Sequence, residues 1–521
     1  MSDRNFRRLA PSAAIARIPF AVRTKNGAFG FCDCPRSIKG ENMEKRNLTL
    51  LTDLYQLTMM NGYYLKGRHE KTAVFDVFFR QNDLITYSLA AGLEQAVDYI
   101  MNLSFGKDEI EYLRSLNLFD EGFLKYLSEM KFTGDVYAVP EGVPVFPGEP
   151  ILTVKAPIIQ AQLIETAILN MMNHQTLIAS KAAKICHAAE NDSVMEFGLR
   201  RAQGPDAGIY GARAAIIGGC NSTSNVLAGK MFDFKVSGTH SHSWVMNFPS
   251  EYEAFKAYAD IYPDATLLLV DTYNTLKSGV PNAIRVFDEL KAKGKKPLGI
   301  RLDSGDLAYL SKEARKMLDD AGYPDTLICA SGDLDEHLIS SLKAQGAKID
   351  LWGVGTKLIT SEEMPALGGV YKLSAMEDDD GNLVPKIKLS DNSAKITNPG
   401  FKSIYRVFVD GMAEADVIFL RGEKFDTEKP LTLYHPLERW KSITFEKYEL
   451  KEITKTIVKN GEVVYDFPSL KEIAATAKKE LAFFWEEYKR IDYPHIFKVD
   501  LSDELYALKT SMIKEIRGEN N

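Results

Sequence analysis

The residues best suited to chemistry lie in the run Gly238-Thr239-His240-Ser241-His242-Ser243, where two histidines stand among small polar side chains after an apolar stretch. An imidazole in such surroundings can act as a nucleophile or as a base, provided that a carboxylate orients it. Asp271, at the end of the next apolar run, is the candidate for that carboxylate. The pattern therefore predicts a site in which one of these histidines and Asp271 carry the reactive step.

The spacing His240-Ser241-His242 also occurs in metal-dependent barrel hydrolases, so a metal site is a second interpretation. Such a site needs further histidines at later strand ends, because neutral imidazoles are the usual ligands. After His242 only His337, His435 and His495 remain, and none of them ends an apolar run between residues 193 and 370. The pattern favours a nucleophile or base over a metal site.

Several later apolar runs also end in polar motifs, among them Arg301-Leu302-Asp303-Ser304-Gly305-Asp306, Ser331-Gly332-Asp333 and Gly353-Val354-Gly355-Thr356. Glycines and hydroxyls at strand ends leave backbone N–H groups open to a phosphate. Asp303 and Asp333 can accept hydrogen bonds from ribose hydroxyls or hold a cation, and the alternative is that they cap the helices that follow. These motifs predict a phosphate- and sugar-binding edge.

An aromatic residue and two guanidinium groups stand together in Phe197-Gly198-Leu199-Arg200-Arg201. The ring can stack on a planar substrate while a forked cation holds an anion. Alone, the motif is equally compatible with a core phenylalanine followed by surface arginines.

A regular alternation of strands and helices between residues 193 and 370 positions these motifs. The strand-like runs are residues 194–197, 232–236, 266–270, 297–302, 326–330 and 349–354. Alternating β and α segments imply parallel strands joined by right-handed crossovers. An open doubly wound sheet and a barrel are both compatible with this alternation. Because polar motifs end nearly every run, we expect the barrel: an irregular or incomplete, TIM-like parallel α/β barrel.

The flanking regions have less regular patterns. Before the alternation, a helix that Thr52 or Asp53 can cap, a strand at 73–80, a helix at 90–103, short strands within 134–154 and a long helix at 159–189 indicate an α+β, sandwich-like unit. After it, the strand-like stretches 386–390 and 405–419 are expected to return to that N-terminal layer, before helices at 469–488 and 503–516. We therefore predict domains at 43–190, 191–371 and 372–521.

Composition limits the remaining possibilities. The 521 residues are 45% hydrophobic and carry a net charge of −7 with both signs interspersed, which argues against a nucleic-acid surface. No apolar segment approaches the roughly 20 residues of a membrane span. Five cysteines in so long a chain fit a reducing, cytoplasmic compartment. Residues 1–42, with eight Lys or Arg against three acids, are expected to be a disordered leader or an extension upstream of the true start at Met43.

Seven motifs, in this order, resemble those of the nicotinate phosphoribosyltransferases. They are Thr52-Asp53-Leu54-Tyr55, Glu196-Phe197-Gly198-Leu199-Arg200-Arg201-Ala202, Ser224-Asn225-Val226-Leu227-Ala228-Gly229, Gly238-Thr239-His240-Ser241-His242-Ser243, Arg301-Leu302-Asp303-Ser304-Gly305-Asp306, Ser331-Gly332-Asp333 and Gly353-Val354-Gly355-Thr356. The resemblance extends from Leu48 to the 440s, and the set is far more specific than any one motif. One departure is Gln81-Asn82-Asp83, where a more basic, proline-containing turn is expected.

The resemblance implies an enzyme that joins nicotinate to 5-phosphoribosyl 1-pyrophosphate, with Mg²⁺, and that couples the reaction to ATP hydrolysis through a phosphohistidine. It implies His242 as that histidine, and a homodimer in which Tyr55 of one subunit and Phe197 of the other enclose the pyridine ring. The Mg²⁺ would be held through pyrophosphate and not by protein ligands alone. The other implied substrate-binding residues are Arg200 and Arg301 for anions, Asp303 and Asp333 for ribose, Gly332, Gly353, Gly355 and Thr356 for the 5-phosphate, and Asn225 and Thr239.

Three rival functions stay open at this point: a nicotinamide phosphoribosyltransferase of the same fold, a metal-dependent barrel hydrolase that uses His240 and His242, and a non-catalytic nucleotide-binding module. The amide-using relatives carry an aspartate where this chain has Asn225, so we expect Asn225 to favour the nicotinate anion.

Displacement at the anomeric carbon passes through a cationic sugar. It therefore needs positioning groups and anion clamps more than a strong base.

Overall fold

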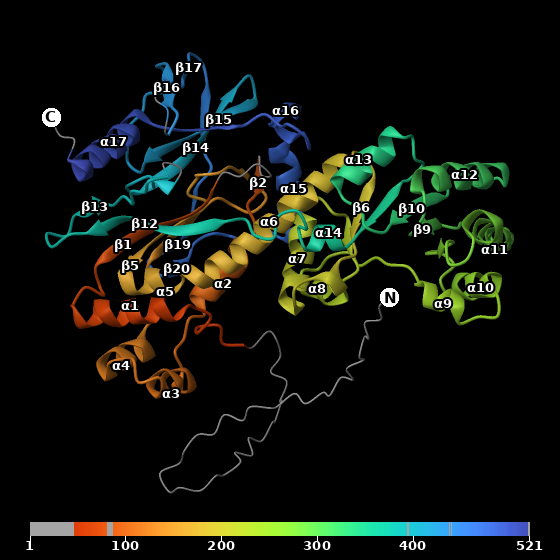
Figure 1. The fold of residues 1–521 in the computed structure, drawn as a ribbon, viewed down its shortest axis with the longest axis horizontal. Helices are drawn as coiled ribbons and strands as arrows, with labels where there is room; N and C mark the ends of the chain where they lie inside the picture. The colour runs from red at the N-terminus through yellow and green to blue at the C-terminus, as the bar shows by residue number, and fades with distance from the viewer. Residues whose placement is uncertain (1–45, 81–86, 393–394, 437, 439, 519–521) are drawn as a thin grey trace, which may run out of the picture. The chain divides into compact units, whose positions relative to one another are not determined.

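The computed structural model describes residues 46–80, 87–392, 395–436, 438 and 440–518, and its fold is drawn in Figure 1. The predicted leader 1–42 and the turn Gln81-Asn82-Asp83 lie outside the described residues. Within them, no helix is long and apolar enough to cross a membrane.

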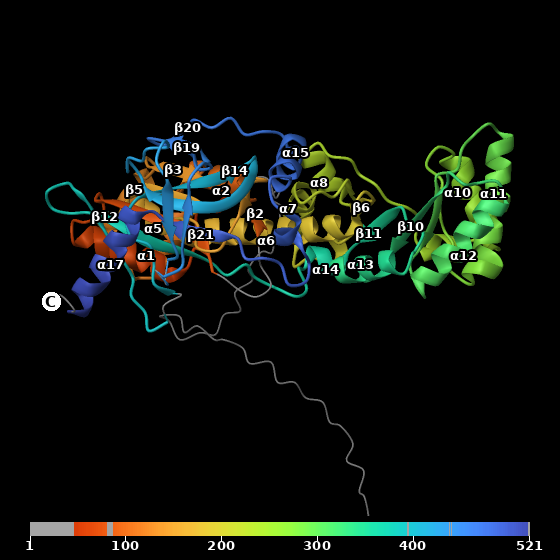
Figure 2. The same ribbon diagram turned by 90° about the horizontal axis from the view of Figure 1, so that it is seen from above.

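A six-stranded parallel sheet carries the predicted motifs. Its order is β7-β6-β11-β10-β9-β8, and every pairing is parallel. The strands are β6 (Ser193–Glu196), β7 (Ser222–Thr223), β8 (Leu267–Leu269), β9 (Gly299–Leu302), β10 (Leu327–Ser331) and β11 (Leu351–Val354). They are mostly buried, as expected when helices cover a parallel sheet. Figure 2 shows β6, β11 and β10 side by side.

The helices of this unit alternate with its strands, which confirms the predicted parallel α/β arrangement. They are α7 (Pro205–Ile217), α8 (Val226–Met231), α9 (His242–Met246), α10 (Glu251–Ile261), α11 (Val280–Ala292), α12 (Leu307–Asp320), α13 (Glu336–Ala344) and α14 (Thr356–Ile359). The side chains of Asp306 and Asp335 cap α12 and α13 by accepting the N–H groups of Tyr309 and Leu338.

A closed barrel is not found among the described strands, so the TIM-like part of the prediction is not confirmed. The strand expected at 232–236 is wrong: only Val236 forms a bridge, with Thr223. The physical reason is Asp233, whose φ of 48° interrupts an extended backbone. Strands β7 and β8 are therefore the two edges of the sheet in the part of the chain that is described.

A second, antiparallel sheet combines N-terminal and much later strands, as the prediction of a completed N-terminal layer required. Its order is β13-β12-β1-β5-β3-β19-β20. The early strands are β1 (Thr72–Phe79), β3 (Asp135–Ala138) and β5 (Leu152–Pro157), and the late ones are β12 (Gly369–Glu377), β13 (Leu383–Pro385), β19 (Lys455–Lys459) and β20 (Glu462–Val463). Strand β1 pairs with β12 from Ala73 opposite Met376 to Phe79 opposite Gly369.

The helices before the parallel sheet are α1 (Leu54–Leu65), α2 (Leu93–Met101), α3 (Lys107–Ser115), α4 (Glu121–Glu129), α5 (Ile158–Leu163) and α6 (Glu165–Ala189). The long helix predicted at 159–189 is thus divided at Ile164. Helix α6 connects the two halves, because it packs on α2 and β2 (Ser88–Leu89) and also on α7 and α13. Strand β2 pairs with β4 (Pro144–Val145).

The prediction that residues 386–390 and 405–419 return to the N-terminal layer is wrong. Residues 386–390 form no strand, and 405–419 belong to a third sheet of order β17-β16-β21-β15-β14-β18. Asp410 and Gly411, both with positive φ, close the β14–β15 hairpin, and such a turn pairs the two strands with each other. The remaining elements are β14 (Lys402–Val409), β15 (Met412–Leu420), β16 (Leu431–Tyr434), β17 (Ser442–Phe445), β18 (Glu449–Glu452), β21 (Lys498–Leu501), α15 (Leu470–Leu481), α16 (Glu486–Lys489) and α17 (Asp503–Arg517).

Candidate active site

Arg301, at the end of β9, joins three of the predicted motifs at the carboxyl edge of the parallel sheet. Its Nε donates to Ser331 Oγ at 2.7 Å, one Nη to Thr239 Oγ1 at 2.9 Å and the other to Asp303 Oδ1 at 2.6 Å. The carboxyl ends of parallel strands meet at one edge of a sheet, which is why segments distant in sequence converge here. The structure therefore assembles a polar cluster from the side chains of these predicted motifs.

Asp303 is held as an anion within this cluster. The hydroxyl of Ser331 donates to it, and Nε2 of His242 lies 3.8 Å from its Oδ2. Burial disfavours the charged carboxylate, but the Ser331 hydroxyl and the Arg301 guanidinium outweigh that effect and hold the pKa of Asp303 below its ordinary value.

Asp271 supports the loop that carries Asp303. Its Oδ2 accepts the N–H of Asp303 at 3.0 Å and the hydroxyl of Ser304 at 2.6 Å. Its Oδ1 is buried and has no hydrogen-bond partner among the described residues. A buried carboxylate oxygen without a partner is suited to a hard cation such as Mg²⁺.

His242 is the first residue of α9, and its side chain is 40% exposed at the edge of the sheet. Its Nδ1 lies 3.1 Å from Thr272 Oγ1. The structure thus brings His242 together with Asp303 and with Thr272. Asp271, the expected orienting carboxylate, instead contacts the Asp303 loop.

His240 has a different environment from His242, although only one residue separates them. It is 7% exposed, its Nε2 accepts the N–H of Leu269 at 3.3 Å, and its ring packs edge-on against Tyr258 at 4.8 Å. Burial, assisted by the neighbouring Arg301 and His242, lowers the pKa of His240 to about 4. Its Nε2 is therefore occupied within the fold, and its Nδ1 is buried without a hydrogen-bond partner among the described residues. His240 and His242 thus do not form a cluster of metal ligands with other side chains in the described part of the chain, as the hydrolase interpretation requires.

Phe197 lies against the glycine motif of β11. Its N–H donates to Val354 O at 2.8 Å, and a Cβ built on Gly353 would lie 2.7 Å from the ring. The Arg301 guanidinium lies 5.6 Å from the ring centroid. Glycine at 353 is thus required for the close approach of this ring, and Gly332, with a φ of 95°, likewise lets the backbone pass close to Asp303 O.

Glu196 has a structural role that no pattern in the sequence predicted. It is fully buried, its Oε2 accepts the Thr223 hydroxyl at 2.5 Å, and its other oxygen accepts the N–H of Gly198. Burial raises its pKa. Glu196 therefore fixes the turn that presents Phe197, and the only signal in the sequence was its place in the motif Glu196-Phe197-Gly198.

The structure settles whether Asp303 and Asp333 are helix caps. The caps of α12 and α13 are Asp306 and Asp335, so the capping interpretation is wrong for both residues. Asp333 is exposed and has a φ of 45°, a left-handed conformation that aspartate adopts more readily than most other residues besides glycine. Thr356 begins α14, and Lys357 beside it pairs with Asp335 at 2.6 Å.

Asn225 is part of the local fold. It is buried, its Oδ1 accepts the N–H of Ala228 as the N-cap of α8, and its Nδ2 donates to Gly208 O, both at 3.1 Å. Arg200 is exposed in the short turn Leu199–Arg201 after β6.

Tyr55 is not brought to the site within this chain. Its side chain is 49% exposed on α1, and among the described residues no hydrogen bond or ring contact joins it to the polar cluster. Leu54 and Met59 are also exposed on that helix. Tyr55 is therefore not a core residue of this chain.

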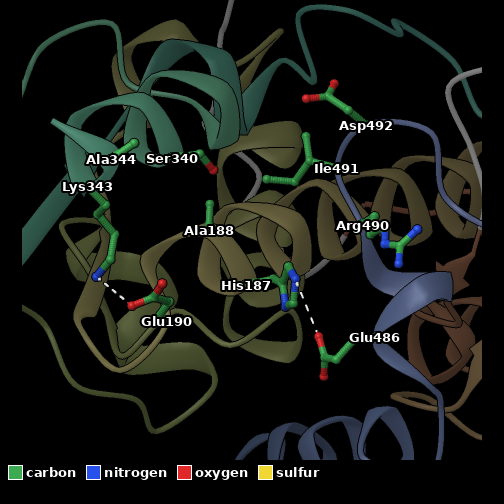
Figure 3. Close-up of a pocket in the computed structure, with 10 residues that line it drawn as sticks. All are labelled: His187, Ala188, Glu190, Ser340, Lys343, Ala344, Glu486, Arg490, Ile491 and Asp492. Atoms are coloured by element: carbon green, nitrogen blue, oxygen red, sulfur yellow. Dashed lines mark ion pairs between the residues drawn. The ribbon is translucent and has the colours of Figure 1, made fainter.

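Two other features lie apart from this cluster. A pocket of about 820 Å³ contains none of the predicted site residues, and Figure 3 shows the ion pairs Lys343–Glu190 and His187–Glu486 on its walls. Glu336, His337 and Glu363 have the composition of a metal site. However, the ammonium of Lys181 lies 2.7 Å from Glu336 and 3.4 Å from Glu363 and already supplies a cation there.

Comparison with known proteins agrees with this geometry. Three family models match the chain: the nicotinate phosphoribosyltransferase N-terminal domain at residues 50–173, the nicotinate phosphoribosyltransferase family at 193–411 and the C-terminal domain at 401–509. The nicotinate phosphoribosyltransferase of Bacillus subtilis is 48% identical over 475 residues, which cover 91% of this chain and 96% of that protein. The human enzyme is 31% identical, with 89% of this chain and 96% of the relative covered.

Solved structures give the same result. The crystal structure of human nicotinic acid phosphoribosyltransferase matches with a TM-score of 0.79 and 30% identity, over 88% of this chain and 99% of that one. A nicotinate-nucleotide pyrophosphorylase from Pyrococcus furiosus shares the fold, with a TM-score of 0.65 and 23% identity over 86% of this chain and 98% of that one. The ordered motifs, the cluster that they form and these matches have one explanation: the chain belongs to the nicotinate phosphoribosyltransferase family.

Proposed function

We propose that this chain joins nicotinate to 5-phosphoribosyl 1-pyrophosphate, giving nicotinate mononucleotide and pyrophosphate. The bond from the pyridine nitrogen to the anomeric carbon forms as the bond from that carbon to the pyrophosphate oxygen breaks. The observation that carries the proposal is the cluster of Arg301, Asp303 and His242 beside Phe197, in a chain of this family.

Each part of the cluster suits one part of the substrates. Phe197 offers a ring for the pyridine, and Arg301 and Arg200 offer cations for the anionic groups. Asp303 and Asp333 offer acceptors for the ribose hydroxyls, and the 5-phosphate would lie against the backbone of Gly332, Gly355 and Thr356 at the strand ends. Gly353 is buried in β11 under the Phe197 ring and would act by allowing that packing. Thr239 is tied to Arg301 and places its hydroxyl at the same edge.

We further propose that ATP phosphorylates His242. Because Thr272 contacts Nδ1, the nucleophile is Nε2, on the side of Asp303. The N–P bond forms as the bond between the γ-phosphorus and the leaving ADP oxygen breaks, and hydrolysis of the phosphohistidine then returns the imidazole and phosphate.

Mg²⁺ fits this site on the evidence of Asp271, whose buried Oδ1 has no partner in the described part of the chain. Asp271 would share the ion with pyrophosphate oxygens, and the ion would offset the phosphate charges. The proposed compartment is the reducing cytoplasm, because Cys186, Cys220 and Cys329 are free thiols.

A homodimer would complete the site. Tyr55 is exposed on α1 beside Leu54 and Met59, which suits a ring that stacks on the pyridine bound by a second copy. We also propose that the parallel sheet is an incomplete barrel. Residues 236–242 would take the place of further strands between the edge strands β7 and β8, through the contacts of Val236 with Thr223 and of His240 with Leu269.

The test incubates the purified chain with nicotinate, 5-phosphoribosyl 1-pyrophosphate and Mg²⁺, with and without ATP, and measures nicotinate mononucleotide, pyrophosphate and ADP. We expect the mononucleotide and pyrophosphate in equal amounts, and faster formation with ATP. Asp303→Asn should lose most activity, whereas the same change three residues later, Asp306→Asn, should retain it because asparagine also caps a helix. Preference for nicotinamide, or no mononucleotide at all, would contradict the proposal.

A further inference from the structure

Residues 236–242 connect the two edges of the parallel sheet. At one edge, Val236 bridges Thr223 of β7, and the N–H of Ser237 donates to Thr223 O at 2.9 Å. At the other edge, the imidazole of His240 accepts the N–H of Leu269 in β8 at 3.3 Å. The backbone bridge at Val236 and the side chain of His240 thus hold this segment between the edge strands β7 and β8.

The side chain of His240 supplies an acceptor that the backbone does not. Strand β8 pairs only with β9 among the described strands, and Leu269 is buried. A buried N–H without an acceptor is costly. Because Nε2 accepts this N–H, the neutral ring carries its proton on Nδ1, which is buried and has no hydrogen-bond partner among the described residues. Burial, which lowers the pKa of His240 to about 4, keeps the ring neutral and Nε2 available as an acceptor near neutral pH.

Packing fixes the ring in that orientation. His240 is 7% exposed and contacts Tyr258 and Phe255 of α10, with centroid distances of 4.8 and 6.1 Å. The preceding residue, Thr239, is held by Arg301 of β9 at 2.9 Å. Two adjacent side chains therefore anchor the segment to neighbouring strands, just before His242.

We propose that His240 is a positioning residue for His242. By accepting the Leu269 N–H it fixes residues 236–242 across the sheet and places the His242 imidazole between Thr272 and Asp303. The phosphorylation assay below rests on the proposed function, whereas the imidazole measurement does not.

Two substitutions separate the hydrogen bond from the packing. His240→Gln retains an acceptor at about the reach of Nε2, and His240→Phe retains a ring against Tyr258 without an acceptor. We expect His240→Phe to slow phosphorylation of His242 about tenfold, which corresponds to about 1.4 kcal/mol. His240→Gln should stay much closer to the wild type, and KM for nicotinate should change little. His240→Leu replaces the phenylalanine variant if that one does not fold.

The independent readout is the imidazole ¹⁵N spectrum of histidine-labelled protein, in which the His242 signal is the one lost in His242→Ala. It should shift or broaden in His240→Phe and return in His240→Gln. Phe255→Leu is the matched control, because it loosens the same packing without touching the Leu269 hydrogen bond. The proposal would be overturned if folded His240→Phe kept both the His242 signal and the phosphorylation rate of the wild type. It would also be overturned if His240→Phe and His240→Gln lost phosphorylation rate equally, or if Phe255→Leu shifted the His242 signal as much as His240→Phe does. If the wild type makes no mononucleotide, the proposed function fails, and the spectrum still decides the role of His240.

Discussion

Two arginine–aspartate pairs in this chain have similar contact distances and different surroundings. Arg301 and Asp303 meet at 2.6 Å at the edge of the parallel sheet, where their side chains are 15% and 30% exposed. Arg406 and Asp416 meet at 2.7 Å between β14 and β15, where both are fully buried. Arg301 divides its donors among three polar partners, whereas Arg406 directs two donors to one carboxylate and lies between Phe146 and Phe484.

These surroundings allow the Arg301–Asp303 pair to exchange its partners for substrate groups, but not the Arg406–Asp416 pair. Substrate oxygens can replace the contacts of Arg301, because these are divided among several side chains that are partly exposed to solvent. The bidentate Arg406–Asp416 pair is fully buried, so no substrate group can reach it. The pKa values of the carboxyl groups also differ between the two regions. Asp303 has a lowered pKa, while burial together with the charge of Asp416 raises the pKa of Glu149, beside Arg406, well above its ordinary value.

The largest expected effect concerns function alone. His242→Ala should reduce ATP-coupled turnover by about a thousandfold or more, equivalent to about 4 kcal/mol, while slow, ATP-independent product formation remains. The free energy of unfolding should change by only about 0.5 kcal/mol, because the side chain is partly exposed. Phosphate transfer from labelled ATP and urea unfolding measure the two quantities. His187→Ala, in the pocket of Figure 3, is the control. Label that still appears on His242→Ala would assign phosphorylation to another residue.

The next effect concerns stability alone. Asp416→Ala should lower the free energy of unfolding by about 3–5 kcal/mol, because it removes the carboxylate that accepts two donors of the fully buried Arg406. Turnover per folded molecule should be unchanged. Asp410→Asn, in the turn of the same hairpin, should cost little because asparagine tolerates positive φ. Loss of turnover in folded Asp416→Ala would show that the two regions are not separate.

A smaller effect tests whether a second copy covers the exposed site. Tyr55→Ala should weaken base binding by on the order of 1–3 kcal/mol, by analogy with base–aromatic stacking, with little loss of thermal stability. Tyr112→Ala, an exposed tyrosine on α3, is the control. Mixed dimers of Tyr55→Ala and His242→Ala chains should regain activity, because one site then has both residues intact. No recovery, with subunit exchange confirmed by mass, would exclude a shared site.

The smallest effect concerns a buried polar residue near the site. Asn225→Asp retains the oxygen that caps α8 but loses the donor to Gly208 O, which should cost about 1 kcal/mol of stability. The new carboxylate should also reduce kcat/KM for nicotinate more than for nicotinamide, because it repels the nicotinate anion. Asn225→Ala is the comparison that removes the amide without adding charge. Equal effects on both substrates would assign Asn225 to the fold only.

The sequence predicted the strands of the parallel sheet well where each is a continuous apolar run ended by a polar motif, as at residues 297–302 and 349–354. It failed at 232–236, because the composition of Phe232 to Val236 does not reveal the left-handed conformation of Asp233. It also placed the β14–β15 region in the wrong sheet, since hairpin pairing is local but the choice of sheet depends on long-range packing.

The same limit applies within the site. That Arg301, Asp303 and Ser331 converge follows from the rule that parallel strands end at one edge. The place of His242 does not follow from it, because the strand expected before it at 232–236 does not form. Which atoms touch does not follow from the sequence: His242 contacts Thr272 and not Asp271, and the imidazole of His240 accepts a backbone N–H. Glu196 was missed for a similar reason, because its partner Thr223 lies in another strand and no periodicity links the two.

The pairing of β1 with β12 has a consequence for biosynthesis. On the ribosome, β5 emerges soon after β1, but the other edge of β1 stays unpaired until residues 369–377 have been made. All strands of the parallel sheet are translated before that, so the nascent chain can form that sheet while β1 still presents open N–H and C=O groups. Such an edge is prone to pair with other chains. A chain released from a ribosome that stalls shortly before residue 369 should therefore aggregate more readily than one released just after residue 377, in which β1 can pair on both edges.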